Sequence, residues 1–218
     1  MTRSLTRRRV VLGAGLVPAL SATGLGGCVS LGLDGPTQAQ LQYRWRDLGP
    51  PPIRRERPLV NALLLQAMPG APAADTLNLV YTREGGALAT YQFARWAERP
   101  LRVLPRALQQ RLEARGSVGV TALLGDPQQA DWLLTLTIDE LHHASLPAPG
   151  RGRLAVTAEL YDRRARQRVA RRSFGAEPPL SGEATAAAAV QALSQALTQV
   201  LDAMLPWLED ALAAAGQR

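Results

Sequence analysis

The sequence contains a single cysteine, Cys28, and its surroundings give that thiol a specific chemistry. Four arginines lie before residue 10, an apolar run extends from Val10 to Leu25, and Gly26 and Gly27 come directly before the cysteine. A basic start, a short apolar run and small residues at its end are typical of a secretory signal peptide. Because the run is shorter than the ~20 apolar residues that span a membrane, we predict that residues 1–27 are cleaved off.

The sequence Leu25-Gly26-Gly27-Cys28 resembles the bacterial lipobox. This resemblance implies that Cys28 is diacylated on its sulfur, released by cleavage before it and acylated again on its new amino group. Two or three acyl chains hold a protein stably on a membrane. The alternative is a buried cysteine behind an ordinary signal peptide, but a lone cysteine in an exported chain favours the lipid anchor. No cofactor is expected beyond these covalent acyl chains on Cys28.

The residues after Cys28 predict a tether and one domain. Residues 28–42 are rich in glycine and polar residues without apolar periodicity, as in a flexible linker, and residues 43–218 form the predicted domain. Val29 stands where an aspartate usually signals inner-membrane retention of Gram-negative lipoproteins, so we expect an outer-membrane location with the domain facing the periplasm. The run Arg7-Arg8-Arg9 is compatible with twin-arginine export as well as with general secretion.

The charge of the chain does not indicate nucleic-acid binding. Of the 25 basic residues, four lie in the predicted signal, which holds no acidic residue, so the formal charge of +7 falls to +3 in the mature chain. All basic residues are arginines, and no basic stripe interleaved with aromatics is present. A single cysteine also leaves no internal disulfide, so the fold must depend on its core.

Periodicity predicts eight strands and two principal helices. Alternating or short apolar runs predict strands at residues 43–48, 59–68, 77–82, 87–93, 118–124, 131–141, 154–160 and 168–174. Leucines at helical spacing predict a first helix that starts near Leu104, because Pro105 is best tolerated in a first turn, and that ends at Gly116. A second helix is expected after Ser181 as N-cap, with a kink or end at Pro206. We therefore predict an α+β fold, in which two helices pack on a mainly antiparallel sheet in two layers.

No set of residues predicts a catalytic or metal site. His142 and His143 are adjacent on a predicted strand and point to opposite faces, so we interpret them as structural. A shift in apolar parity indicates a bulge near Asp139 and Glu140, which also diverge. Ser117 lacks the first glycine of a nucleophile elbow. We do not expect an enzyme.

The segment Trp96-Ala97-Glu98-Arg99-Pro100, before a helix with leucine spacing, resembles the ABC-type transport auxiliary lipoproteins, the PqiC-like family. The resemblance extends over residues 41–208. It implies a non-enzymatic outer-membrane accessory subunit of an MCE-type ABC system that moves lipids between the two membranes. The implied partners are an MCE-domain protein and its inner-membrane permease and ATPase. Trp96, Glu98 and Pro100 carry the signature, and we expect Trp96 to be buried at the strand-to-helix corner rather than to contact lipid or a partner.

Two alternatives stay open at this point. The chain could instead be a stand-alone envelope lipoprotein that stabilises a cell-wall enzyme or binds a small ligand. The second helix also carries a nearly uncharged face, which predicts cover by a sheet edge or neighbour and a possible homo-oligomer, against a monomer whose helix is merely alanine-rich. This face comprises Gln191, Ser194, Gln195, Thr198 and Gln199.

Overall fold

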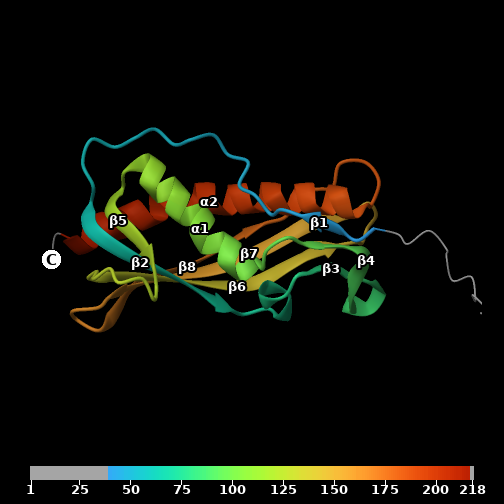
Figure 1. Ribbon diagram of the computed structural model, residues 1–218, viewed down its shortest axis with the longest axis horizontal. Coiled ribbons are helices and arrows are strands. Elements are labelled where there is room, and N and C mark those ends of the chain that lie inside the picture. The colour runs from blue at the N-terminus through green and yellow to red at the C-terminus, as the bar shows by residue number, and fades with distance from the viewer. Residues whose placement is uncertain (1–38, 217–218) are drawn as a thin grey trace, which may run out of the picture. The chain divides into compact units, whose positions relative to one another are not determined.

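The computed structural model describes residues 39–216 (Figure 1). The lipobox and Cys28 lie outside the described residues. The long helices are α1 (Pro100–Arg115) and α2 (Ala186–Gly216). The strands are β1 (Leu41–Tyr43), β2 (Val60–Pro69), β3 (Asn78–Thr82), β4 (Leu88–Trp96), β5 (Val118–Leu123), β6 (Trp132–Ala144), β7 (Arg151–Asp162) and β8 (Gln167–Ala176), and short 3₁₀ turns lie at Pro72–Asp75 and Glu84–Gly86. This order agrees with the order predicted from the sequence.

One eight-stranded sheet is organised around β6. Along one edge, β6 pairs with β7 over its whole length, and β8 follows β7. Along the other edge, the first half of β6 pairs with β2, whereas its last residues reach β3. The sheet therefore divides on this side into two short arms, with β5 beyond β2 in one arm and β4 and β1 beyond β3 in the other.

The predicted α+β class with two principal helices is confirmed, and the sheet is mixed. The long ladders β6–β7 and β7–β8 and the hairpin β3–β4 are antiparallel, as expected. By contrast, β2 lies parallel to both of its neighbours, β5 and β6. Parallel neighbours need a long crossover connection, and the chain between β2 and β5 supplies it with β3, β4 and α1.

Both helices pack on the same face of the sheet (Figure 1). α1 packs on β2 and β5, and α2 packs on β7 and β8. Their leucines form one core with the inward residues of the central strands, and burial of each such side chain contributes about 1.5–3 kcal/mol. The fully buried leucines and isoleucine include Leu63, Leu65, Leu104, Leu108, Leu112, Leu134, Leu136, Ile138, Leu154 and Leu160. No helix within residues 39–216 has the length and apolarity that a membrane span requires.

The predicted start of α1 near Leu104 is wrong, because the helix begins at Pro100. A proline at the first helical position loses only an N–H that has no partner inside the helix. Pro105 then lies inside the helix, where it is buried against the core. The predicted end is confirmed: Gly116 has a φ of 67°, and its N–H donates to the carbonyl oxygens of Leu112 and Glu113.

The predicted N-cap of α2 is also wrong. The cap is Thr185, whose hydroxyl accepts a hydrogen bond from the N–H of Ala188 at 3.2 Å, while Ser181 lies in the preceding loop. The helix does not end at Pro206 but continues to Gly216. Because Pro206 is on the exposed side of the helix, water can satisfy the carbonyl that its missing N–H leaves free.

Candidate functional site

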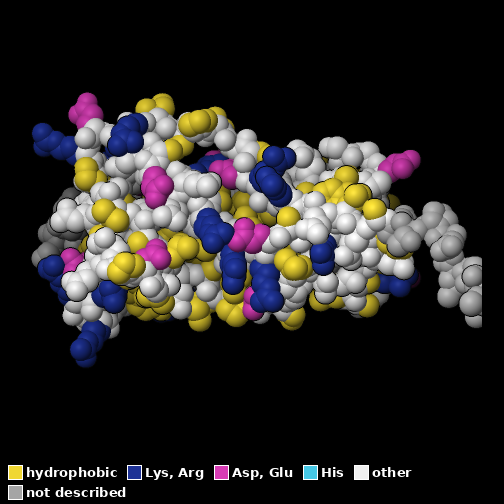
Figure 2. Space-filling view, viewed as in Figure 1, with side chains coloured by type: hydrophobic (Ala, Val, Ile, Leu, Met, Phe, Trp, Pro, Cys, Tyr) yellow, Lys and Arg dark blue, Asp and Glu magenta, His cyan; other side chains and the backbone are white. Residues whose placement is uncertain are grey.

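The signature residues form the corner between β4 and α1. Trp96, at the end of β4, is 2% exposed, as expected for a side chain that fixes this corner. Its ring lies 6.2 Å from that of Trp45, centre to centre. Glu98 forms an ion pair of 2.5 Å with Arg106 on α1, and Pro100 starts the helix. Figure 2 shows basic and acidic side chains close together in the middle of this face, where Figure 1 places α1.

The segment 44–48 was predicted as a strand, but only Leu41–Tyr43 pair in the sheet. The segment lies on α2 instead. The indole nitrogen of Trp45 donates to the carbonyl oxygen of Leu193, and the N–H of Leu48 donates to the hydroxyl of Thr198. The alternating pattern therefore reflects packing on a helix, and the prediction that residues 44–48 form a strand is wrong. The chain's own N-terminal segment therefore covers part of the uncharged face of α2.

A buried arginine fastens this segment to both helices. Arg111 of α1 donates two hydrogen bonds to the carboxylate of Asp47, at 2.5 and 2.7 Å, and a further one to Asp202 of α2. Burial by itself would raise the pKa of Asp47, but the hydrogen bonds from Arg111, Gly49 and Thr198 outweigh it and hold that pKa below its usual value. The hydrogen bonds to Asp47 and Asp202 outweigh burial and raise the pKa of Arg111, so Arg111 and Asp47 both stay charged.

A second cluster surrounds Glu209 near the end of α2. Arg55 and Arg115 form ion pairs with its carboxylate at 3.3 and 3.0 Å, and the hydroxyl of Ser117 donates to it. Burial would raise the pKa of Glu209, but the bonds from Arg115 and Ser117 prevail and lower it. Ser117 is fully buried in this cluster, which gives it a structural partner and no access to a substrate.

The histidines lie as predicted, on opposite faces of β6. The register of the β6–β7 ladder shifts between Ile138 and Glu140, which confirms the bulge. His143 is 1% exposed and its Nε2 donates to the carbonyl oxygen of Pro149 at 3.0 Å, so Nδ1 accepts from the hydroxyl of Tyr91 at 2.7 Å. Burial lowers the pKa of His143 and, together with Tyr81, raises that of Tyr91 to about 12.

The acidic residues beside the bulge have separate partners. Asp139 accepts a hydrogen bond from the hydroxyl of Thr157 at 2.7 Å, and Glu140 forms an ion pair with Arg153 at 2.5 Å. Within residues 39–216, no group of three or more histidine, cysteine, aspartate or glutamate side chains could hold a metal ion.

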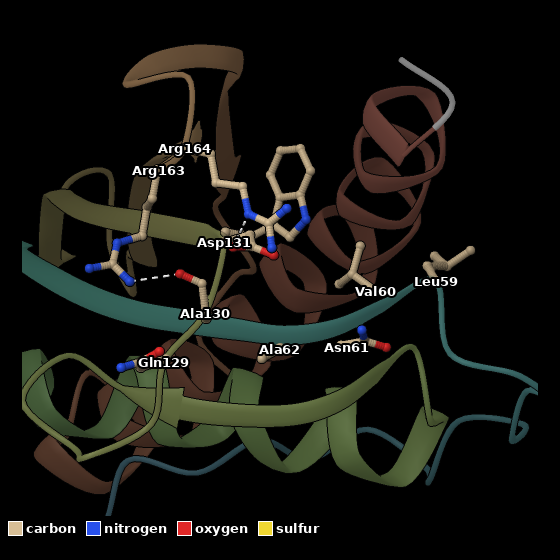
Figure 3. A pocket seen from close by; sticks show the side chains of 10 residues that line it. Leu59, Val60, Asn61, Ala62, Gln129, Ala130, Asp131, Arg163 and Arg164 are labelled. Carbon is tan, nitrogen blue, oxygen red and sulfur yellow. Dashed lines mark hydrogen bonds and ion pairs between the residues drawn. The ribbon is translucent and has the colours of Figure 1, made fainter.

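An open groove of about 830 Å³ lies beside the start of β2 (Figure 3). One side is formed by the start of β2, and the other by the residues before β6 together with the turn between β7 and β8. Its lining combines Trp132 with the polar side chains Asn61, Gln129, Asp131, Arg163 and Arg164. No local spacing in the sequence indicated this groove, because its walls come from three separate segments.

Comparison with known proteins identifies the family of this chain. A crystal structure of a Xanthomonas campestris protein has a TM-score of 0.65 and 20% identity, over 84% of this chain and 94% of that one. A crystal structure of an uncharacterized protein has a TM-score of 0.58 and 15% identity, over 77% and 99%. Both similarities concern the fold alone. A search of the curated proteins finds no match.

The family described as the ABC-type transport auxiliary lipoprotein component matches residues 48–205. The match includes the strand-to-helix corner at Trp96, both ion-pair clusters except Asp47 and Glu209, and most of α2. The chain therefore belongs to the family of ABC-type transport auxiliary lipoprotein components.

Proposed function

We propose that this chain is an outer-membrane lipoprotein and a non-enzymatic accessory subunit of an MCE-type ABC system that moves lipids between the inner and outer membranes. The observation that carries the proposal is the family match over residues 48–205. The partners in this proposal are an MCE-domain protein and its inner-membrane permease and ATPase.

The anchor in this proposal is Cys28. The motif Leu25-Gly26-Gly27-Cys28 would supply covalent acyl chains, and Val29 favours transfer to the outer membrane. The first described strand, β1, begins at Leu41, two residues before the predicted start of the domain. A short tether therefore separates the acylated end from the sheet and would keep the domain close to the membrane.

The described ionisable groups support a binding or positioning role. Arg111, Glu209 and His143 each bind partners within the fold, where they hold the helices, the segment 44–48 and the sheet together. Groups of this kind stabilise a scaffold rather than activate a nucleophile. We therefore propose that the domain binds transport partners while its acyl chains hold it on the membrane.

The anchor is tested with Cys28→Ser. Cells labelled with an alkyne fatty acid should incorporate label into the wild-type protein and not into the variant, and density-gradient fractionation should place the wild type with outer-membrane markers. Equal labelling of both proteins would contradict the anchor. Recovery of the wild type with inner-membrane markers would contradict the location.

The partnership is tested by crosslinking in intact cells followed by purification of the lipidated protein. We expect the MCE-domain protein of the same cell to copurify. Copurification with a peptidoglycan synthase and without transport proteins would instead favour a stand-alone lipoprotein that stabilises a cell-wall enzyme.

A further inference from the structure

The groove lies where the sheet is incomplete. β2 pairs with β5 from Val60 onward, but its pairing with β6 starts only at Leu63. Along Val60–Ala62, the edge that faces away from β5 therefore has no strand partner in the described chain. Backbone N–H and C=O groups on such an edge are a template for another extended segment. Figure 3 shows β2 continuing past the point where β6 begins.

The opposite wall of the groove is held away from β2 by the turn between β7 and β8. The N–H of Arg163 donates to the carbonyl oxygen of Asp131 at 2.8 Å, and its guanidinium donates to that of Ala130 at 2.7 Å. Arg164 forms an ion pair with Asp131 at 2.5 Å (Figure 3). Residues 130–131 are thereby fixed to β7, and the gap of about 830 Å³ beside β2 is a formed feature of the fold.

The turn beside this gap, residues 163–166, carries positive charge that no carboxylate of the described chain neutralises. Asp131 is neutralised by Arg164, and Asp162 accepts two N–H groups of the turn, at 2.8 and 2.9 Å. Arg163 and Arg166 are exposed, and neither has a carboxylate within ion-pair distance among residues 39–216. Guanidinium groups bind carboxylates in charge-assisted, often bidentate hydrogen bonds. The gap therefore suits an acidic, extended ligand.

The gap lies at one end of the sheet, away from the first described residues. β6 begins beside it at Trp132 and extends over 13 residues, or ~40 Å, toward the end of the sheet where β3, β4 and β1 lie. The chain enters the domain at that other end (Figure 1).

We propose that this gap, Val60–Ala62 on one side and Gln129–Trp132 with Arg163 on the other, is a binding slot for an extended acidic segment of a partner protein. The segment pairs its main chain with the free edge of β2, and Arg163 and Arg166 bind its carboxylates. Main-chain pairing gives affinity in such strand addition, and the side chains give specificity. Pairing with the slot of a second copy is disfavoured, because it would bring like charges together.

The inference rests on the proposed function, because the partner is a transport protein that approaches from the membrane opposite the anchor. The slot is tested in cells with a photo-crosslinking amino acid at Asn61, in the full-length lipidated protein. The matched position is Gln92 on β4, an exposed residue in the other arm of the sheet. We expect adducts from Asn61, and not from Gln92, that map by mass spectrometry to an acidic, non-helical stretch of a transport partner.

The charge requirement is tested with the double substitution Arg163→Glu and Arg166→Glu. Arg83→Glu is the control, because Arg83 is exposed, forms no ion pair within residues 39–216 and lies in the hairpin between β3 and β4. The double variant should reduce the Asn61 adduct at least tenfold, because two charges that attract an acidic segment are replaced by two that repel it. Arg83→Glu should leave it unchanged, and thermal unfolding should show that both variants fold.

Several outcomes would overturn the slot. These are adducts to a second copy of this chain, to lipid or to glycan, adducts from Gln92 alone, or an Asn61 adduct that survives the double substitution. If transport proteins still copurify with the double variant, the proposed function stands and the slot fails. If the Asn61 adduct forms on an acidic stretch of a protein outside transport, the slot stands and the proposed function fails.

Discussion

The indole nitrogen of Trp45 donates a hydrogen bond to the carbonyl oxygen of Leu193 at 2.9 Å, across a sequence separation of 148 residues. Trp45 is buried and also contacts Trp96, the residue that ends β4. One side chain thereby joins the first described segment, the signature corner and the last helix. The N-terminal segment is part of the folded domain and not a loose continuation of the tether.

Trp45→Phe should lower the free energy of unfolding by about 1 kcal/mol, because the ring stays buried while one hydrogen bond is lost. Trp45→Ala should lower it by about 3–5 kcal/mol, because a large cavity then opens between β4 and α2. Urea unfolding followed by far-UV circular dichroism measures both. Equal stability of the two variants would contradict the packing role of the ring.

Acid should destabilise the protein through Asp47 and Glu209. Both carboxyls have pKa values in the fold below their usual values. Their stabilising contribution is therefore complete above the unfolded pKa of about 4 and is lost as the pH falls through the lowered values. Unfolding free energies measured from pH 7 to pH 3 should drop below pH 4, and Asp47→Asn should make this drop smaller. An unchanged pH profile in Asp47→Asn would contradict it.

His143 should add a separate loss of stability on acidification, in a pH range above that of the two carboxyls. Burial lowers its pKa from 6.5, so the fold favours the neutral ring. The contribution of His143 to the free energy of unfolding is complete above pH 6.5. It declines as the pH falls toward the lowered pKa of the folded state, because the histidine of the unfolded chain takes up its proton first. His143→Gln retains one donor and one acceptor, and it should flatten the change in unfolding free energy between pH 7.5 and 5.5. A slope equal to that of the wild type would assign the effect to another group.

Gly150 should tolerate no side chain. It has a φ of 95°, and an added Cβ would lie 2.3 Å from the carbonyl oxygen of Ala144 and 2.4 Å from Nε2 of His143. Gly182 has a similar φ of 78° but open space around it. Gly182→Ala should therefore cost only the backbone term of about 1–2 kcal/mol, whereas Gly150→Ala should cost clearly more. Thermal unfolding of the two variants compares them, and equal melting temperatures would contradict the steric argument.

The possible homo-oligomer stays a prediction, and its surface is now smaller. Ser194 is buried and Thr198 bonds to Asp47 and Leu48, so only the glutamines of the uncharged face are left to meet another subunit. Gln195→Arg with Gln199→Arg should break such an assembly through like-charge repulsion while the fold is retained. Light scattering on residues 29–218 decides, and a monomeric wild type at high concentration would refute self-assembly.

Local patterns predicted most of the elements. Alternation located the seven longer strands, and a shift in parity revealed the bulge before His143, because both depend on neighbours in sequence. Gly116 was predictable for the same reason, since a left-handed C′ position favours glycine over other residues. The parallel orientation of β2 could not be predicted in this way, because it depends on the path that the chain takes between β2 and its neighbours β5 and β6.

The features that hold the domain together were the least predictable. Asp47 and Arg111 are 64 residues apart, and Ser117 and Glu209 are 92 apart, so no spacing motif connects them. Thr185 was missed as the cap of α2 because Ser181 is an equally good cap by residue type, and only the path of the loop selects between them. The groove beside β2 is formed by residues 59–62, 129–132 and 163–164, so no single stretch of sequence could predict it.

The contact between the segment 44–48 and α2 has a consequence for how the domain would resist a pulling force. If acyl chains at Cys28 hold the protein while a partner pulls on the far end, tension enters through β1 and passes directly to Trp45, Asp47 and Leu48. These residues are hydrogen-bonded to α2 and α1, the two helices that pack on the sheet. Such a force would be shared by these hydrogen bonds, so that the short parallel pairing of β1 with β4 would not have to resist it alone.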